Sequence, residues 1–291
     1  MNALPLPPVR PEIIHDLEPI GTVAALTPPS TATRWFRLGW LRKALLLLAL
    51  ALVWEVVARW QDNELLLPTA LQTARAFAAG MVSGELPGYI AASLAVLLQG
   101  YALGVAGALL LTTLALGSRL GRDLLETLTA MFNPLPAIAL LPLALLWFGL
   151  GRGSLIFILM HSVLWPLALN TYAGFQGVPE TLRMAGRNYG LNGLRLVLHI
   201  LVPGALPAIL SGLKIGWAFA WRTLIAAELV FGTTSSGEGG LGWYIFQNRN
   251  ELYTDKVFAG LAAVILIGLL VENLGFRTLE RLTVRRWGMQ R

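Results

Sequence analysis

Between Arg183 and Pro207 the chain reads RMAGRNYGLNGLRLVLHILVPGALP. This segment begins with two arginines, an asparagine and a glycine, continues with closely spaced leucines, and ends in two prolines four residues apart. A lipid-exposed span would not tolerate so polar a beginning, and a solvated loop would not need so many leucines. The segment therefore predicts interfacial helices joined by a turn.

Single residues around this segment predict where its helices begin and end. A helix from Pro179 to about Tyr189 is favoured, because proline suits a first helical position, where its missing N–H would be unpaired anyway. Gly190 then stops the helix, since glycine adopts the left-handed conformation cheaply. Asn192 can cap a second short helix, Gly193 to Leu201, and the two prolines punctuate the entry into the next span.

Composition indicates what surrounds this segment. The chain has 291 residues, of which 56% are hydrophobic and 13% charged, against about 25% charged in soluble domains. The deficit is concentrated in long apolar runs, so we expect an all-α, polytopic membrane protein with cytoplasmic helices between its spans. There is no cysteine, which excludes a disulfide framework. The net charge is +6, and the positive residues lie mostly between and after the apolar runs. Nucleic acid is therefore not an expected partner.

The apolar runs predict six transmembrane helices, each long enough for a hydrocarbon core of ~30 Å at ~1.5 Å per residue. Between the first two spans, the Pro68–Thr69 start and the spacing of Leu71, Ala74 and Phe77 predict an amphipathic helix at the membrane interface. The six predicted spans are about 40–60, 89–116, 124–148, 153–175, 207–232 and 256–276.

Three regions follow from these spans. We expect 1–39 to be a cytoplasmic, mostly disordered, Pro-rich tail, because its first 33 residues hold seven of the sixteen prolines. No apolar stretch follows a basic start there, so we do not expect a cleaved signal peptide. Residues 40–276 form the predicted six-span domain, which includes a cytoplasmic helical segment at 178–206. Residues 277–291 are predicted to be a basic cytoplasmic tail.

The positive residues predict the orientation. With the N-terminus inside, the inner segments hold fifteen Lys and Arg residues and the outer segments hold five. Because cytoplasmic loops carry the excess of positive charge, we expect both termini and the Arg183–Pro207 segment to be cytoplasmic.

The spacing inside the opening segment is similar to a family motif. Gly190, nine residues, Ile200, one residue and then Val202-Pro203 resemble the "EAA" motif of ABC importer permeases, although Met184-Ala185-Gly186 stands where Glu-Ala-Ala is expected. Two further blocks resemble the third and fifth spans of the nitrate/sulfonate/taurine-type permeases, over a likeness that covers roughly 40–285. These blocks are NPLPAIALLPLALLWFGLGRGS (Asn133–Ser154) and WRTLIAAELVFG (Trp221–Gly232).

This resemblance implies a type I permease with six spans that pairs with a second copy as a homodimer in the bacterial-type cytoplasmic (inner) membrane. It implies nucleotide-binding ATPase subunits docked on the cytoplasmic segment and an extracytoplasmic solute-binding protein. The chain has no G-x-x-x-x-G-K-[ST] sequence, so we expect no cofactor in this chain and ATP and Mg in the partner ATPase. The implied coupling residues are Ala185, Gly186, Arg187, Asn188, Tyr189, Gly190 and Leu191.

Charges inside the fifth span are candidates for the translocation pathway, because they are costly in lipid and often functional. Arg222 and Glu228 are six residues apart, about 240° around a helix, so they do not share a face. A guanidinium suits a carboxylate, sulfonate or other oxyanion; the alternative is a structural pair with a carboxylate on another span, or snorkelling to an interface.

Two prolines interrupt the third span early. They remove backbone hydrogen bonds, and either build a kink that lines the pathway or mark the entry of the span. The three histidines show no metal-ligand spacing, so no metal site is predicted, and His161 is expected to be a buried histidine with its hydrogen bonds satisfied. The candidate pathway residues are Asn133, Pro134, Pro136, Trp221, Arg222 and Glu228.

Other residues in the spans have structural interpretations. We expect Glu55 and Arg59 to pair across one helical turn and Lys214 to snorkel to the inner interface. Gly100, Gly104 and Gly107 predict close helix packing in the second span.

The sequence thus predicts the membrane subunit of an importer, and not an enzyme, for a small anion such as nitrate, sulfonate, taurine or a carboxylate. An ion-gradient-driven secondary transporter or channel remains the alternative, although no internal repeat of the kind common in such transporters is visible. A membrane-embedded enzyme is a further alternative, but no cluster of His, Asp and Glu converges in any span.

Overall fold

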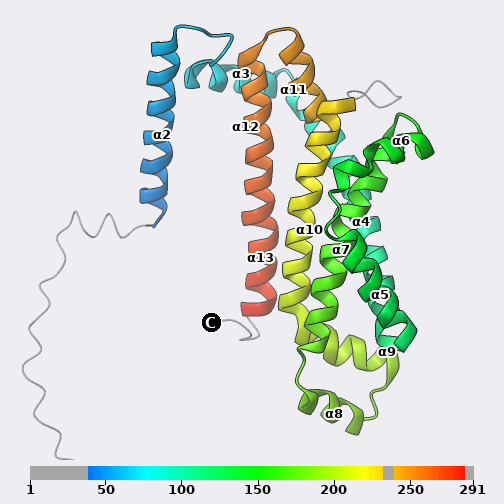
Figure 1. The fold of residues 1–291 in the computed structure, drawn as a ribbon. Helices are drawn as coiled ribbons and strands as arrows, with labels where there is room; N and C mark the ends of the chain where they lie inside the picture. The colour runs from blue at the N-terminus through cyan, green and yellow to red at the C-terminus, as the bar shows by residue number, and fades with distance from the viewer. Residues whose placement is uncertain (1–38, 232–238, 286–291) are drawn as a thin grey trace, which may run out of the picture. The chain divides into compact units, whose positions relative to one another are not determined.

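The computed structural model describes residues 39–231 and 239–285, and every regular element in these ranges is helical (Figure 1). The predicted fold class is therefore confirmed as all-α. The chain forms two compact units, Met1–Leu52 and Val53–Arg291, and the boundary falls within the first described helix. The predicted disordered tail, apart from its last residue, and the end of the predicted basic tail lie outside the described residues.

Helix α2 (Gly39–Gln61) crosses the unit boundary, and its last residues belong to the second unit. Three short π-helical segments, η2, η3 and η4, and one 3₁₀ turn, η1, interrupt the α-helices of that unit. Its elements after α2 are α3 (Ala70–Val82), α4 (Glu85–Gly117), α5 (Arg119–Phe132), η1 (Ala137–Leu140), α6 (Leu141–Phe148), α7 (Arg152–Gln176), α8 (Glu180–Asn188), α9 (Gly193–Leu196), η2 (Val197–Leu201), α10 (Val202–Phe231), α11 (Leu241–Asn250), α12 (Thr254–Leu270), η3 (Val271–Phe276), α13 (Arg277–Glu280) and η4 (Arg281–Arg285).

Glycines bring α4, α7 and α10 into close contact at the centre of the second unit. A Cβ added at Gly104 of α4 would lie 2.6 Å from Cβ of Val163 and 2.9 Å from the carbonyl oxygen of Met160 on α7. Further along α7, a Cβ at Gly174 would lie 2.5 Å from Cβ of Ala208 on α10. The absent side chains let the backbones approach, which confirms the predicted packing role of the α4 glycines.

Four helices of the described residues are long and apolar enough to cross a membrane, or five if one bent pair counts as a span. The four helices are Glu85–Gly117, Arg152–Gln176, Gly193–Val230 and Thr254–Val284. The first two confirm the predicted second and fourth spans. The count of six is not confirmed. Helix α2 coincides with the first predicted span, but only 11 residues separate Lys43 from Glu55, or ~16 Å of uncharged helix.

The predicted third span, 124–148, is broken at its prolines. Helix α5 ends at Phe132, and the helical pair on either side of the break, Arg119–Phe132 and Ala137–Phe148, is bent by 89°. Pro134 and Pro136 carry no amide hydrogen, so they cannot continue the helical ladder. Of the two alternatives left open by the sequence, the kink is the one observed, and it lies within a longer helical segment.

The fifth and sixth spans are both longer than predicted. The helix that contains the fifth span begins at Gly193, and Pro203 and Pro207 lie within it and do not separate it from a short helix. The π-helical segment η2 lies immediately before Pro203, where the amide of Val202 donates to the carbonyl of Val197. This wider turn gives room for proline, which would clash with the carbonyl four residues earlier in a regular helix. The last helix likewise continues beyond 276, through Arg285.

Between the first two predicted spans lies α3, the predicted amphipathic helix. Thr69 forms a capping box with Gln72 at its start, which satisfies two otherwise unpaired donors. The predicted pair is also confirmed, because Arg59 Nη2 lies 2.7 Å from Glu55 Oε1. Lys214, in contrast, does not extend alone to an interface, since its ammonium pairs with Glu272 on the last helix.

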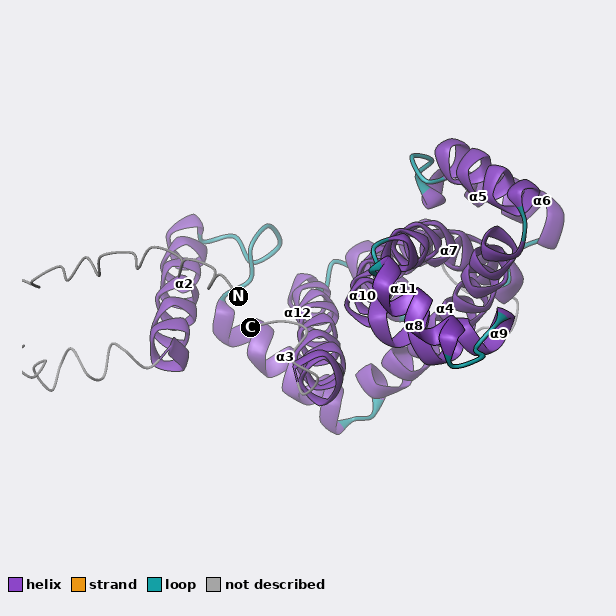
Figure 2. Cartoon of the chain, turned by 90° about the horizontal axis from the view of Figure 1, so that it is seen from below, coloured by secondary structure: helices purple, strands orange, loops and turns teal. Residues whose placement is uncertain are grey.

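The short helices lie at opposite ends of the second unit. In Figure 1, α8 and α9 lie at one end of α7 and α10, whereas α6 and α11 lie towards the other. Figure 2 shows α5 and α6 outside the group formed by α4, α7 and α10. One end of this group thus carries the predicted coupling segment, and the break between α5 and α6 faces α7 from the side.

Candidate functional site

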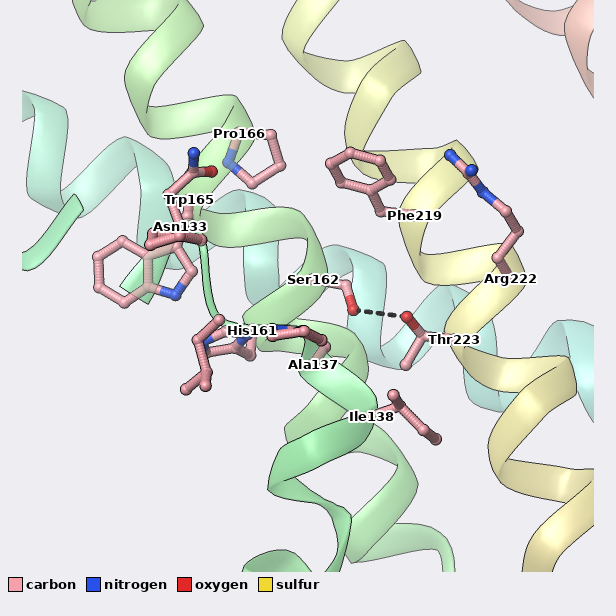
Figure 3. Close-up of a pocket in the computed structure, with 13 residues that line it drawn as sticks. Asn133, Ala137, Ile138, His161, Ser162, Trp165, Pro166, Phe219, Arg222 and Thr223 are labelled. Atoms are coloured by element: carbon pink, nitrogen blue, oxygen red, sulfur yellow. Dashed lines mark hydrogen bonds between the residues drawn. The ribbon is translucent and has the colours of Figure 1, made fainter. Parts of the chain in front are cut away.

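A cavity of about 310 Å³ lies between the α5–α6 break, α7 and α10 (Figure 3). The structure brings four of the six predicted pathway residues to it: Asn133, Pro134, Pro136 and Arg222. Its remaining walls include His161, Ser162, Trp165 and Pro166 from α7 and Phe219 and Thr223 from α10. His161 and Arg222 are each nine residues from one end of their helix, or ~14 Å, so the cavity lies well inside the spans.

Arg222 is exposed at the edge of this cavity. Its Nε donates to the carbonyl of Ala218 at 3.0 Å, and its guanidinium carbon lies 5.1 Å from the centre of the Phe219 ring. Within 39–231 and 239–285, no carboxylate pairs with it, so the structural pair considered from the sequence is not observed there. A stacked guanidinium with unused N–H groups can bind an anion bidentately.

His161 and Trp165 form the inner wall, and both were missed as site residues. Each side chain is 8% exposed, and Nε2 of His161 and Nε1 of Trp165 have no hydrogen-bond partner among the described residues. The expectation of a satisfied buried histidine is therefore wrong. The i, i+4 spacing on a predicted helix was the available signal, because it places both rings on one face; Phe132 stacks on Trp165 at 5.3 Å and completes the cluster.

A hydrogen bond between the hydroxyls of Ser162 and Thr223 joins α7 to α10 beside these rings, at 3.1 Å (Figure 3). Among the described residues, no acidic side chain lines this cavity. In the described part of the chain, no group of three or more His, Asp or Glu residues could hold a metal ion. The cavity therefore has a positively charged edge at Arg222 and apolar walls, and the rings of His161 and Trp165 in its inner wall each contain a buried nitrogen atom without a partner.

The structure places Glu228 and Trp221 away from the cavity. Glu228 is buried and accepts hydrogen bonds from the Ser93 hydroxyl and from the amide of Gly242, each at 2.9 Å. The same hydroxyl accepts the amide of Leu241 at 2.8 Å. This network fixes the start of α11 against α4 and α10, and Trp221 packs in the hydrophobic core. Glu228 and Trp221 therefore have structural roles in this chain, one in a hydrogen-bond network and the other in the core.

The predicted coupling residues surround the turn between α8 and α9. Gly190 has φ +77°, and the amides of Gly190 and Leu191 donate to the carbonyls of Arg187 and Gly186 at 2.9 and 3.0 Å. This pair of bonds is a Schellman motif, which satisfies carbonyls at the end of a helix. Asn192 lies at the predicted N-cap position, but its side chain makes no capping bond.

The side chains of this turn divide into exposed and packed ones. Tyr189 is 88% exposed, and Ala185, Arg187, Asn188 and Gly190 are also exposed, while Leu191 is partly buried. Gly186 is buried, and a Cβ there would lie 2.8 Å from Leu196 Cδ1 and 2.9 Å from Ile200 Cγ1. Gly186 therefore holds α8 against the start of the long helix and does not face a partner.

Arg183 turns inward, although it belongs to the polar start of the segment. Its Nη2 donates to the carbonyl of Phe175 at 2.5 Å, near the C-terminal end of α7, where unpaired carbonyls and the helix dipole favour a cation. Glu180 lies 3.8 Å from Arg183 and 3.9 Å from Arg187. The guanidinium of Arg183 thus anchors α8 to α7.

Apolar spans, a cavity between them and an exposed helical turn at one end define a membrane transport subunit. The family described as "Binding-protein-dependent transport system inner membrane component" matches residues 100–283. The chain therefore belongs to this family.

Its relatives include transport permeases for several small solutes. The chain is 33% identical over 235 residues to an aliphatic sulfonates transport permease protein of Escherichia coli (strain K12), SsuC, covering 80% of this chain and 87% of the relative. It is 36% identical over 160 residues to the taurine transport system permease protein TauC of the same organism, covering 55% and 56%. It is 28% identical over 242 residues to the nitrate import permease protein NrtB of Synechocystis sp., covering 80% and 86%. The chain is accordingly an ABC transporter permease of the sulfonate, taurine and nitrate type.

Proposed function

We propose that this chain forms the translocation pathway of an ATP-driven importer for a small anion such as a sulfonate, taurine, nitrate or a carboxylate. The observation that carries the proposal is a continuous mechanical connection. The exposed turn at Tyr189–Gly190 packs through Gly186 onto the start of a helix that extends from Gly193 to Val230, and Arg222 on this helix borders the cavity.

This connection explains how a partner could act on the pathway. A force on the exposed turn is transmitted to α7 by Arg183 and to the long helix by the contacts of Gly186 with Leu196 and Ile200. The π-helical segment η2 is the place where this helix departs from regular geometry, and such segments frequently mark functional sites. Movement of the helix relative to α7 would change the cavity between them.

The proposal includes partners outside this chain. Nucleotide-binding ATPase subunits bind ATP and Mg and dock on the exposed turn at the cytoplasmic side, where both termini also lie. An extracytoplasmic solute-binding protein delivers the anion at the opposite end, and a second copy of the permease completes the pathway in the lipid bilayer of the inner membrane. The binding-protein-dependent family and the names of the relatives support these partners.

Co-purification tests the coupling surface. The double variant Tyr189→Ala with Arg187→Glu removes an exposed ring and reverses an exposed charge, so we expect loss of the ATPase subunits from the purified complex. Tyr253→Ala is the matched control, because this exposed tyrosine immediately precedes α12, and the connection from α11 to α12 lies at the opposite end of the second unit from α8 (Figure 1). Retention of the ATPase by the double variant at the control level would refute the assigned surface.

Reconstitution separates the proposal from its alternative. The permease, its ATPase subunits and the binding protein in liposomes should take up the anion only with ATP and Mg. Uptake by the permease alone under an ion gradient would instead establish a secondary transporter or channel.

A further inference from the structure

A different cavity, of about 340 Å³, lies between the end of α4, helix α8 and the start of the long helix that begins at Gly193. We propose that this cavity binds the phosphate of an anionic phospholipid such as phosphatidylglycerol. Arg187 and Arg183 hold the phosphate, and the acyl chains extend along α4. The inference goes beyond the proposed function, because lipid binding requires neither the ATPase nor an imported solute.

The length of α4 places this cavity at the depth of lipid headgroups. Helix α4 has 33 residues, or ~50 Å at ~1.5 Å per residue, whereas a bilayer with its headgroup regions is ~40–45 Å thick. The ends of α4 therefore reach the headgroups. Thr113, Leu116 and Gly117 at one of these ends form a wall of the cavity, and basic pockets between spans are binding sites for anionic headgroups.

The charges around the cavity favour a ligand with one negative charge. Arg183 and Arg187 lie in its wall, and no acidic side chain of the described residues does. Glu180, outside the wall, lies 3.8 Å from Arg183 and 3.9 Å from Arg187. One carboxylate thus faces two guanidinium groups, and the excess positive charge would be neutralised by one phosphodiester.

The two arginines differ in how much of their binding capacity is free. Arg183 is held in place by its bond to the Phe175 carbonyl, so it supplies a fixed charge. The side chain of Arg187 is 57% exposed and donates no hydrogen bond to any described residue. A guanidinium with free N–H groups binds phosphate bidentately, so we assign the direct phosphate contact to Arg187.

The apolar walls favour a lipid over a soluble phosphate. Leu116, Val197 and Leu201 line the cavity and belong to one hydrophobic cluster. Leu109, Thr113 and Leu116 share one face of α4 because they are four and three residues apart, and Leu109 is 52% exposed. An apolar surface therefore continues from the cavity along α4, where an acyl chain would cover it and a soluble phosphate would not.

The lipid and the ATPase would occupy different parts of α8. Asn188 and Tyr189 at the exposed turn do not line the cavity, whereas Arg183, one helical turn before Arg187, does. A protein docked on the turn therefore leaves the cavity open to the bilayer, and bound lipid would hold α8 against the end of α4.

Native mass spectrometry of the purified, full-length permease tests the inference. The probes are dioleoylphosphatidylglycerol, dioleoylphosphatidylethanolamine with the same chains and no net charge, and glycerol 3-phosphate as a soluble phosphate. We expect tight binding of the first, weaker binding of the second and none of the third. Arg187→Gln should weaken phosphatidylglycerol binding by about fivefold or more, and Arg187→Lys should keep part of the affinity.

Arg195→Gln is the matched control, because Arg195 is exposed on the neighbouring helix α9 and does not line the cavity; it should bind the lipid like the unaltered chain. Thr113→Phe is a second variant, which fills the cavity from α4 without changing a charge, and it should also weaken binding. It keeps the test decisive if Arg187→Gln fails to fold.

Three results would overturn the inference. Equal losses in Arg187→Gln and Arg195→Gln would show a diffuse attraction to the surface. Binding of glycerol 3-phosphate as tight as that of the lipid would show a site for a soluble phosphate. Loss of the ATPase subunits from Arg187→Gln with unchanged lipid binding would assign this arginine to the ATPase alone. In each case ATP-dependent import by the unaltered chain would leave the proposed function intact.

Discussion

Gly190→Ala is the sharpest perturbation that the structure offers, because it isolates one backbone conformation. Gly190 has φ +77°, and no heavy atom lies within 4 Å of a Cβ built there. The substitution therefore adds no clash and acts only through the left-handed conformation, which costs an L-residue about 1–2 kcal/mol. At 1.4 kcal/mol per tenfold change in an equilibrium constant, the native turn should open about 5–30 times more often.

Hydrogen exchange at single amides measures this change. The amide of Leu191 donates to the Gly186 carbonyl at 3.0 Å only while the turn is formed, so its exchange should accelerate by about the same 5–30-fold. Gly190→Asn should accelerate exchange less, because asparagine tolerates the left-handed region. Gly88→Ala is the control, since that glycine has open space and no positive φ.

The turn also predicts a functional result. If the ATPase docks on it, Gly190→Ala should lower substrate-stimulated ATPase activity, and Gly190→Asn should retain more of that activity. Unchanged exchange at Leu191 in Gly190→Ala, or equal effects of alanine and asparagine, would refute the assignment of this glycine to a conformational role.

Three further substitutions test the packing by the free energy of unfolding in detergent. Gly104→Ala should lose about 1–3 kcal/mol through the contact with α7, whereas Gly88→Ala on the same helix should gain up to about 1 kcal/mol; a gain in both would contradict the packing. Ser93→Ala removes one of the two donors to the buried Glu228 carboxylate and leaves the first amide of α11 unpaired, so it should cost about 1–3 kcal/mol; a loss no larger than that of the exposed Ser211→Ala would contradict the network. Thr69→Ala removes the cap of α3 and should cost about 1 kcal/mol, and unchanged stability would show that the cap contributes nothing.

Local sequence rules were sufficient wherever one residue decides the outcome. Pro179 and Gly190 placed the two ends of α8 to within one residue, and Asn192 placed the start of α9, because capping and φ preferences act within one turn of chain. Long apolar runs predicted α4 and α7 for the same reason, since hydropathy needs no knowledge of neighbours. The same rules failed at Pro203 and Pro207, where the helix absorbs both prolines after the π-helical segment η2.

The composition of the site depended on contacts between distant residues, which the spacing of residues along the chain cannot predict. Sequence reasoning selected Arg222 and the prolines of the α5–α6 break separately, and the fold brought them to one cavity with His161 and Trp165. It also selected Glu228, which folding buries against Ser93, 135 residues away in the chain. The sequence determined which residues were unusual for a span, because burial cost is a property of each residue type. Packing between helices decided which of these residues line the cavity and which bind another side chain. Residues distant in the chain become neighbours only when the glycine-lined faces of α4, α7 and α10 come together.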